Sequence, residues 1–442
     1  LLILHDNCSQ PMNKFLSISV FLILASCLTA MSQPNFSYKQ ADWQQEVNYN
    51  IKVTLDDQNH LLKGDISIKY INNSPDDLKD FFIHLWPNAY KNNNSAFAIQ
   101  KDQDNDAKFN TAEESERGYI DSLSFLINGK KAVFTFYQNQ VDIAYFKLET
   151  PLAAGDSFVI TTPFKIKIPG SFSRMGHEKQ AYQISQWYPK PAVYDINGWN
   201  AMPYLDQGEF YSEFGTFNVA ITLPSNYVLA ATGELQEDSE KEFIRNRINN
   251  PIDPSKEIVS SNENKTVTFV QNQVHDFAWF ASKTFNVERN KVTLPSGKVV
   301  ETFVYASLKT INYCNYINDA LLFYSKHAGE YPYKYCSVVL GSLKAGGGME
   351  YPMITVCDYL NEDVIVHEVG HNWFYGILGS NERTYPWMDE SINSFFEGET
   401  TNKKTETNEV ADATLQDLAG NAGIMKAMAI HAIKRGTDQA PG

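Results

Sequence analysis

The stretch Val366–His371 reads VHEVGH, and Glu390 follows His371 after eighteen intervening residues, inside the stretch WMDES. Positions i and i+4 of a helix share one face, so the imidazoles of His367 and His371 are expected to converge on one metal ion. Glu368 lies one step round the same helix, within reach of a water molecule on that ion. Two histidines, one glutamate and an open fourth position form the ligand set of a hydrolytic zinc site rather than a closed structural one.

This ligand set predicts hydrolysis of a peptide or a similar acyl bond. A zinc ion held by His367, His371 and Glu390 lowers the pKa of its bound water towards neutrality and so makes a nucleophile at pH 7. Glu368 is the expected general base, which accepts the proton of this water and passes it to the leaving amine. The alternative is a helix with two chance histidines beside an acid, and the correct placement of Glu390 in a second helix-like segment counts against it.

A glycine-rich stretch, Gly346–Pro352, reads GGGMEYP and precedes the histidine motif. Glycines let a backbone approach a ligand closely, and a strand edge at this point could pair with an extended peptide. Glu350 beside such an edge offers a negative charge to a free α-amino group. A plain loop is the alternative interpretation of these glycines. Neither the lysine nor the spacing of a phosphate-binding loop is present, so no nucleotide site is predicted.

Together the two motifs resemble the hallmarks of the zinc aminopeptidase N family, which also includes leukotriene hydrolase. Those hallmarks are H-E-x-x-H followed by eighteen residues and E, and, upstream of it, G-x-M-E-N. The resemblance implies that the chain removes residues from the free N-terminus of peptides, with zinc as its cofactor and Glu350 as the anchor of the α-amino group. The implied substrate-binding residues around this anchor are Gly347, Gly348 and Met349.

The resemblance also implies an α+β multidomain fold. A mostly antiparallel, saddle-like β-domain is expected over residues 42–285, and a thermolysin-like α/β-to-α catalytic domain over residues 286–442. The segment Gln183–Pro191 resembles the part of the β-domain that reaches into the active site, which makes Gln186 a candidate for contact with the substrate.

Hydrophobic periodicity agrees with this division. Val47–Leu55 and Leu62–Tyr70 alternate with period two, as half-buried strands do. Further short strands are expected at residues 158–160, 164–168, 217–223, 266–270 and 335–340. The polar stretches 91–110 and 234–264 are predicted to be long mobile loops or insertions. Helices are expected at residues 308–330, 361–375, 390–400 and 409–434.

The sequence departs from the family pattern in ways that affect substrate preference more than chemistry. Tyr351 replaces the usual Asn, Asp389 stands where Asn is common, and Ser391 replaces Gly. The family also uses a tyrosine beyond the ligand glutamate to stabilise the oxyanion, and no tyrosine follows Tyr385 in this sequence. We therefore expect a C-terminally truncated chain that binds zinc but turns over slowly.

The formal net charge of -15 gives nucleic-acid binding no electrostatic support. Peptides with free N-termini are the expected partners. Two alternatives stay open: a thermolysin-type zinc endopeptidase, in which Glu350 binds no amine, and a binding module attached to a catalytically impaired remnant.

The N-terminus has the pattern of a signal peptide running from about Met12 to Ser32, preceded by residues 1–11 as translated upstream sequence. Lys14 precedes an apolar run, Phe15–Leu28, that is too short to span a bilayer as a mature helix. Secretion to the periplasm or the cell surface is expected. The alternative is a lipoprotein anchored through Cys27, since residues 24–27 resemble a lipoprotein box. No other segment is apolar enough to cross a membrane.

Three cysteines remain after this processing: Cys314, Cys336 and Cys357. They form no C-x-x-C pair, so a cysteine zinc site is not expected. One disulfide with a free thiol, and three buried unpaired cysteines, both fit the sequence.

Overall fold

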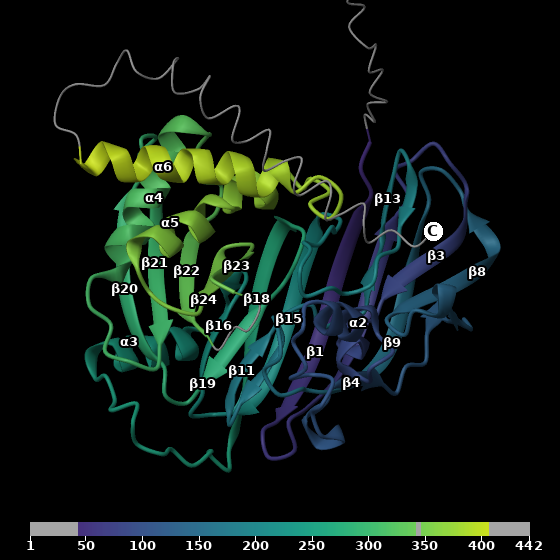
Figure 1. Ribbon diagram of the computed structural model, residues 1–442, viewed down its shortest axis with the longest axis horizontal. Coiled ribbons are helices and arrows are strands. Elements are labelled where there is room, and N and C mark those ends of the chain that lie inside the picture. Colours follow the sequence, from purple (N-terminus) through teal and green to yellow (C-terminus); the bar gives the residue numbers. More distant parts are fainter. Residues whose placement is uncertain (1–42, 342–345, 406–442) are drawn as a thin grey trace, which may run out of the picture. The chain divides into compact units, whose positions relative to one another are not determined.

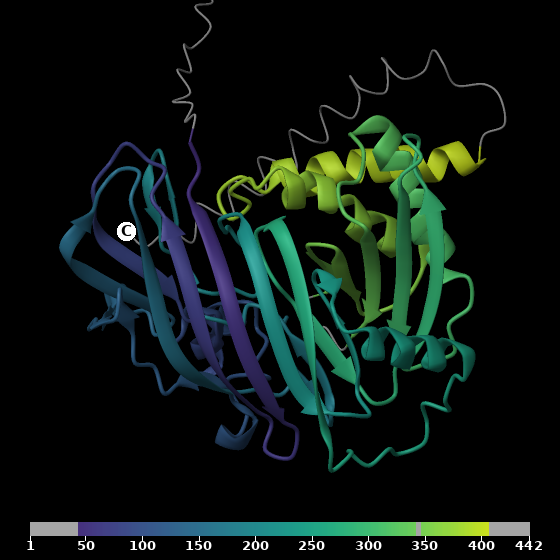
Figure 2. The same cartoon turned by 180° about the vertical axis from the view of Figure 1, so that it is seen from behind.

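The computed structural model describes residues 43–341 and 346–405 (Figure 1). Its largest sheet has nine strands, and five of them are long: β1 (Glu46–Asp56), β2 (Leu61–Ile71), β9 (Ser157–Lys167), β15 (Gly215–Pro224) and β18 (Asn264–Val274). Four short strands complete it: β4 (Tyr119–Asp121), β5 (Leu126–Ile127), β6 (Lys130–Lys131) and β17 (Glu234–Leu235). All pairings are antiparallel except that of β1 with β15. Figure 2 shows purple β1 with teal β15 and β18 beside it.

Alternation of buried and exposed residues explains why these segments form one sheet. Along β1 every second side chain, from Val47 to Leu55, is buried, and the residues between them face solvent or are half-buried. This is the pattern of a sheet with one covered face. The strands predicted for residues 47–55, 62–70, 217–223 and 266–270 are confirmed, and the two short runs at 158–160 and 164–168 form the single strand β9.

Smaller antiparallel units accompany the large sheet. One four-stranded sheet contains β10 (Gly176–Glu178), β11 (Ala181–Ile184), β19 (Trp279–Ser282) and β16 (Val228–Ala231). A second contains β12 (Lys190–Pro191), β3 (Leu78–His84), β8 (Ile143–Leu152) and β7 (Thr135–Phe136). A two-stranded ribbon joins β13 (Val193–Asp195) to β14 (Gly198–Asn200).

The five-stranded sheet carries the motif region. Its order is β20 (Asn286–Thr293), β21 (Val299–Ala306), β22 (Tyr335–Leu340), β24 (Ile354–Cys357) and β23 (Gly348–Tyr351). β21, β22 and β24 are parallel, and the outer pairs are antiparallel. The helices that follow are α4 (Tyr313–His327), α5 (Glu362–Gly370) and α6 (Ile392–Thr405). α4 and α5 lie against the sheet and α6 contacts both helices (Figure 1). The predicted α+β fold is confirmed.

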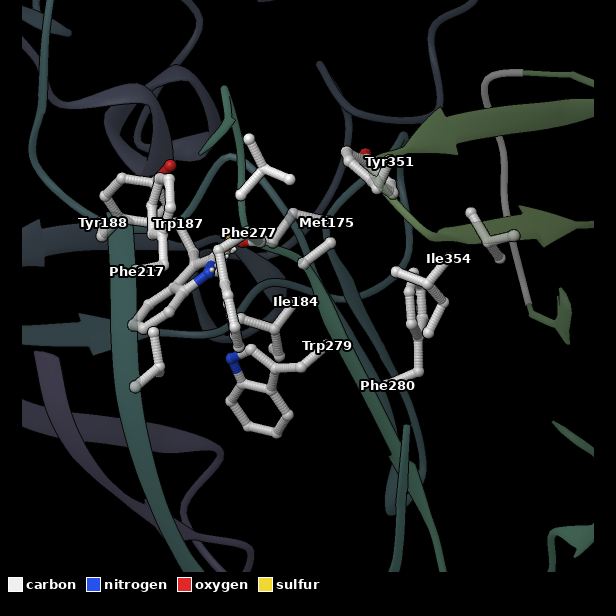
Figure 3. Close-up of a cluster of buried hydrophobic side chains, with 14 of the residues drawn as sticks. Met175, Ile184, Trp187, Tyr188, Phe217, Phe277, Trp279, Phe280, Tyr351 and Ile354 are labelled. Atoms are coloured by element: carbon white, nitrogen blue, oxygen red, sulfur yellow. Dashed lines mark hydrogen bonds between the residues drawn. The ribbon is translucent and has the colours of Figure 1, made fainter. Parts of the chain in front are cut away.

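A buried aromatic cluster connects the glycine-rich strand to the β-rich region (Figure 3). The indole N–H of Trp187 donates to the carbonyl of Phe277 at 3.0 Å. Phe280 of β19 lies with its ring centroid 6.3 Å from that of Tyr351 on β23. Burial of large aromatic rings is the largest apolar contribution a side chain can make. The position of β23 therefore depends on a core built from residues far away in the sequence.

Each of the two stretches predicted as loops or insertions contains a helix that was not predicted. Residues 91–110 contain α2 (Ala96–Gln103), capped by the hydroxyl of Ser95, which accepts from the amide of Ala98 at 3.1 Å. Residues 234–264 contain α3 (Asp238–Asn249), whose one buried apolar residue is Ile244. The apolar residues of α2 are consecutive, Ala96–Ile99, and α3 is mostly polar, so neither helix shows an apolar stripe that periodicity could reveal.

The remaining helix predictions agree in position and differ in length. The helix expected at 308–330 spans Tyr313–His327, and the one expected at 390–400 runs to Thr405. The strand expected at 335–340 is confirmed as β22. The helices expected at 409–434 and the signal segment lie outside the described residues. The domain boundary near residue 286 stays a prediction.

Within the described part of the chain, no helix combines the length and apolarity that crossing a bilayer requires. The three cysteines of the described chain are all buried free thiols: Cys314, Cys336 and Cys357. This agrees with the alternative of three buried unpaired cysteines and not with a disulfide. Burial raises the pKa of each thiol, so these cysteines act as small apolar residues.

Candidate functional site

Helix α5 presents the histidine motif. The side chain of Asn361 caps its first turn by accepting from the amide of Val364 at 2.9 Å, and two acidic residues follow in that turn. Ile365, Val366 and Val369 are buried and fix one face of the helix against the sheet. The opposite face carries His367 and His371, one helical turn apart.

Three ligand atoms converge as the spacing predicts. The Nε2 atoms of His367 and His371 are 3.0 Å apart. Oε2 of Glu390 lies 3.4 Å from Nε2 of His367 and 3.8 Å from Nε2 of His371. Ligands bonded tetrahedrally to one zinc ion at its usual bond lengths are about 3.3 Å apart. The donor set and its spacing therefore fit zinc.

The second nitrogen of each histidine also has a partner. Nδ1 of His367 lies 3.0 Å from Oε2 of Glu397. Nδ1 of His371 contacts Asp389 and lies 3.2 Å from the carbonyl of Phe374. Such partners fix the tautomer and orientation of a metal-binding imidazole. The contacts of Asp389 and Glu397 with the histidines were not predicted from the sequence, although Glu397 lies seven residues after Glu390 and therefore on the same face of a helix.

Close packing of three helices holds these groups in register. The amide of Asn393, in α6, donates to the carbonyl of His367 at 2.7 Å, and the hydroxyl of Tyr324, in α4, donates to the Asn393 side chain at 3.0 Å. A Cβ on Gly370 would lie 2.1 Å from Oδ1 of Asn393. Glycine is therefore required where α5 meets α6.

The predicted helix at 361–375 is regular only as far as Gly370. The carbonyl of His371 accepts from the amide of Gly376 at 2.9 Å, an i to i+5 bond within a π-type turn, Asn372–Ile377. Tyr375 has φ +111, a strained value for a residue with a side chain, and its ring packs 4.5 Å from that of His275. π-type turns within helices occur frequently at functional sites.

Glu368 and Glu350 are buried carboxylates on either side of the ligand set, 6 % and 7 % exposed. Burial, opposed by the neighbouring His371, raises the pKa of Glu368 to about 7 and that of Glu350 to about 8. One oxygen of each has no donor within the described residues. A carboxylate that titrates near neutrality is suited to take up and release a proton.

The charges around the ligands make cation binding compete with protons. Burial disfavours the ionised form of Glu390, yet His367 and His371 lower the pKa of this carboxyl. Burial lowers the pKa of His367, but Glu390 and Glu397 outweigh it and raise that pKa to about 10. A metal ion that binds here displaces these protons, so its affinity increases with pH.

The glycine-rich stretch forms the edge strand β23. It pairs antiparallel with β24, with Glu350 opposite Thr355, and it is the last strand of its sheet. Its outer edge is therefore available to an extended peptide. At its start, a Cβ on Gly348 would lie 2.2 Å from the carboxyl carbon of Glu368. The strand can approach the proposed base this closely because residue 348 is glycine.

These groups share a cavity of about 480 Å³. Its lining includes the predicted residues His367, His371, Glu390, Glu368, Glu350, Gly347, Gly348 and Met349. The structure does not bring Gln186 into the lining: it is 2 % exposed, and its Oε1 accepts from Nζ of Lys190 at 3.4 Å. The lining also contains Arg174, Gln207 and Glu209, which the sequence analysis missed because no motif or spacing links them to the histidines.

A second group of three potential ligands, Glu350, His371 and Asp389, overlaps the first at His371. All three residues are buried, and Asp389 contacts Nδ1 of the histidine rather than Nε2. The group with two histidines and the more exposed Glu390 lines the cavity, and its three protein donors would leave a fourth position for water, as a catalytic site requires.

The chain has the fold of the M1 zinc metallopeptidases, the aminopeptidase N type. A variant of such an enzyme from Deinococcus radiodurans superposes with a TM-score of 0.56 at 16 % identity, covering 86 % of this chain and 76 % of that chain. A variant from Deinococcus radiodurans bound to a Tyr-Ser-Ala substrate also superposes with a TM-score of 0.56, at 15 % identity, covering 86 % of this chain and 76 % of that chain. The M1 zinc metallopeptidase from Deinococcus radiodurans without a substitution gives a TM-score of 0.54 at 15 % identity, with 86 % and 75 % covered. No protein-family model and no curated protein matches the sequence.

Proposed function

We propose that the chain is a zinc-dependent aminopeptidase that removes residues from the free N-terminus of peptides. Bound zinc supplies a Lewis acid and lowers the pKa of water to near neutrality. His367, His371 and Glu390 hold the ion, and Asp389 and Glu397 orient the two imidazoles. Glu368 accepts the proton of the attacking water and delivers it to the leaving amine.

The position of Glu350 is the observation that carries the aminopeptidase assignment. Its carboxylate lies within 4.8 Å of a ring nitrogen of His371, a metal ligand, in the same cavity. The α-amino nitrogen and the carbonyl oxygen of one residue are about 3 Å apart. An ammonium group bound to Glu350 would therefore lie about one residue's length from the proposed ligand set, which favours cleavage of the first peptide bond. The edge of β23 would align the rest of the peptide.

The neighbours in the structural comparison agree with this proposal. One of them was crystallised with a Tyr-Ser-Ala substrate, a short peptide with a free N-terminus. Others were crystallised with L-arginine and L-tryptophan, single amino acids of the kind that an aminopeptidase releases. We infer the same class of substrate for this chain.

Free and N-acetylated aminoacyl-anilides test the proposal directly. We expect the zinc-loaded full chain to hydrolyse leucyl-anilide and to spare its N-acetylated form, because Glu350 requires an ammonium group. Glu368→Gln should lower kcat by at least about a thousandfold with little change in zinc content. Preference for the acetylated substrate would instead identify an endopeptidase. A Glu368→Gln variant as active as the wild type would exclude the enzyme altogether.

We also propose that the chain is exported through its N-terminal leader. Fractionation of cells that express the complete gene separates the two alternatives. Release of a protein beginning after residue 30 or 32 supports a cleaved signal peptide, and membrane retention that Cys27→Ser abolishes supports the lipid anchor.

A further inference from the structure

One wall of the cavity is formed by a loop, residues 203–210, that lies far from the motifs in the sequence. We call it the wall loop. Gln207 and Glu209 line the cavity from this loop, and Arg174 lines it from an adjacent segment. The loop contains no helix or strand, so its shape depends on side chains that bind its backbone.

Two arginines, the buried Arg174 and the half-buried Arg383, hold the wall loop from different parts of the chain. Nη1 of Arg174 donates to the carbonyl of Asp206 at 2.6 Å and to that of Leu205 at 3.4 Å. Nε of Arg383 donates to the carbonyl of Glu209 at 2.8 Å, and its Nη2 donates to that of Pro203 at 3.1 Å. Hydrogen bonds from a charged donor are stronger than those between neutral groups.

Helix α2 holds the middle of the same loop. Oε1 of Gln100 accepts from the amides of Asp206 and Gln207 at 2.7 and 2.9 Å, and its Nε2 donates to the carbonyl of Gln207 at 2.9 Å. Lys101 forms a buried ion pair with Asp206 at 2.9 Å. A loop whose backbone N–H and carbonyl groups are hydrogen-bonded in this way is preorganised. The backbone positions from which its side chains project into the cavity are therefore fixed.

Glu209 is the wall-loop residue that lines the cavity with a carboxylate oxygen that accepts no hydrogen bond from the described residues. Its Oε1 lies 3.1 Å from Nη2 of Arg174, and its Oε2 is buried with no donor among the described residues. The arginine is already engaged elsewhere, since its Nε donates to the sulfur of Met349 at 3.1 Å in addition to the carbonyls of the loop. A buried carboxylate oxygen without a donor is costly, and a cation in the cavity would relieve that cost.

The charge of the lining favours such a cation. Six carboxylates and one arginine line the cavity: Glu209, Glu350, Asp363, Glu368, Glu390, Glu397 and Arg174. A bound zinc ion and a substrate ammonium group favour the ionised forms of Glu350 and Glu368, and with all six carboxylates ionised the lining keeps an excess of negative charge. Four of the carboxylates have roles in the proposed function, and Asp363 is exposed. Glu209 is thus the half-buried carboxylate of the lining that has no role in the proposed function and could bind a second cationic group of the substrate.

We propose that Glu209 is a specificity determinant that makes the enzyme prefer N-terminal residues with a cationic side chain, arginine or lysine. This inference rests on the proposed aminopeptidase function: Glu350 takes the α-ammonium group, and Glu209 takes the side chain of the same residue. An N-terminal aspartate or glutamate is disfavoured by the same charges.

The test compares arginyl-, lysyl-, leucyl- and glutamyl-anilides on the zinc-loaded full chain. We expect kcat/KM for arginine and lysine to exceed that for leucine by about tenfold or more, the worth of one charge-assisted hydrogen bond. Glu209→Gln keeps an acceptor for Arg174 but loses the charge, and should lower the ratio of arginine to leucine by about tenfold. Glu209→Asp keeps the charge and should retain part of the preference.

Glu301→Gln provides the matched control. Glu301 also pairs with an arginine, Arg289, at 2.6 Å, but lies on β21 and does not line the cavity. Its substitution should leave the ratio unchanged. Thermal unfolding of each variant checks that a changed ratio does not come from a damaged fold.

Binding to the Glu368→Gln variant provides a readout that needs no turnover. Calorimetry should show tighter binding of L-argininamide than of L-leucinamide, and adding Glu209→Gln should abolish the difference. An equal loss for arginine and leucine substrates would mean that Glu209 binds the α-amino group, and a wild type that prefers leucine would likewise overturn the inference. Selective binding of argininamide without any hydrolysis would refute the proposed function while supporting the cation subsite.

Discussion

Gly348→Ala tests how closely the glycine-rich strand approaches the proposed base. The added methyl carbon would lie 2.2 Å from both the carboxyl carbon and Oε1 of Glu368. Carbon atoms in contact are about 3.5 Å apart, so the strand or the carboxylate must shift by about 1 Å. A displacement of this size at a reacting group costs about a hundredfold in rate. We therefore expect kcat to fall by about a hundredfold.

The proposed zinc ligands lie on α5, at its C-terminal end and on the segment before α6, so Gly348→Ala should leave the zinc content at one ion per chain. Overpacking should lower the free energy of unfolding by roughly 1–3 kcal/mol. Gly398→Ala is the matched control, because a Cβ there has open space around it. Steady-state kinetics, metal analysis and thermal unfolding measure the three effects. A Gly348→Ala enzyme with kcat within about threefold of wild type would show that the strand does not constrain Glu368.

Three further predictions follow from buried charges. Glu397→Gln weakens the support of one metal-binding imidazole and should lower zinc affinity by about 10- to 100-fold in a chelator competition; an unchanged affinity would contradict that role. Burial raises the pKa of Asp142 to about 7, so the folded chain keeps a proton there that the unfolded carboxyl loses near pH 4. The free energy of unfolding should therefore fall by roughly 4 kcal/mol at most as the pH rises from about 4 to about 7. Asp142→Asn should make this fall smaller when the free energies from urea titrations at pH 5 and pH 8 are compared. An equal fall in the wild type and the variant would refute the raised pKa of Asp142. Lys190→Met removes the ion-pair partner of the buried Asp276, which lies 2.8 Å from Nζ of Lys190. The substitution should lower the free energy of unfolding by roughly 3–5 kcal/mol. A loss below about 1 kcal/mol in urea unfolding would show that the pair contributes little.

Local patterns account for the part of the fold that the sequence could predict. Strict alternation along β1 and β2 identified two strands of the large sheet, and the spacing of the histidine motif placed its residues on one helix face. α2 and α3 escaped notice because tertiary anchors stabilise them instead of an apolar stripe. Lys101 of α2 pairs with Asp206, and Glu240 of α3 pairs with Lys265.

The residues of the candidate site also divide into those that a local sequence pattern reveals and those that only the tertiary structure brings to the cavity. The proposed metal ligands and Glu350 lie within 41 residues of sequence (350–390), and their proposed roles were inferred from spacing and residue type. Arg174 and Glu209 reach the cavity from more than 140 residues before that stretch, without a recognisable pattern. Gln186 was inferred by resemblance, and in the structure its side chain meets Lys190 instead of the cavity. Its predicted contact with the substrate stays a prediction.

The way in which the wall loop is held has a consequence for how the proposed substrate preference could diversify. The hydrogen bonds that fix Gln207 involve its backbone N–H and carbonyl, and Arg383 binds Glu209 through the carbonyl of that residue. Side chains at these two positions can therefore change while these backbone anchors remain. Under the proposed function, selection could thus change which N-terminal residue is accepted through one or two codons, without altering the residues proposed to carry out the hydrolysis.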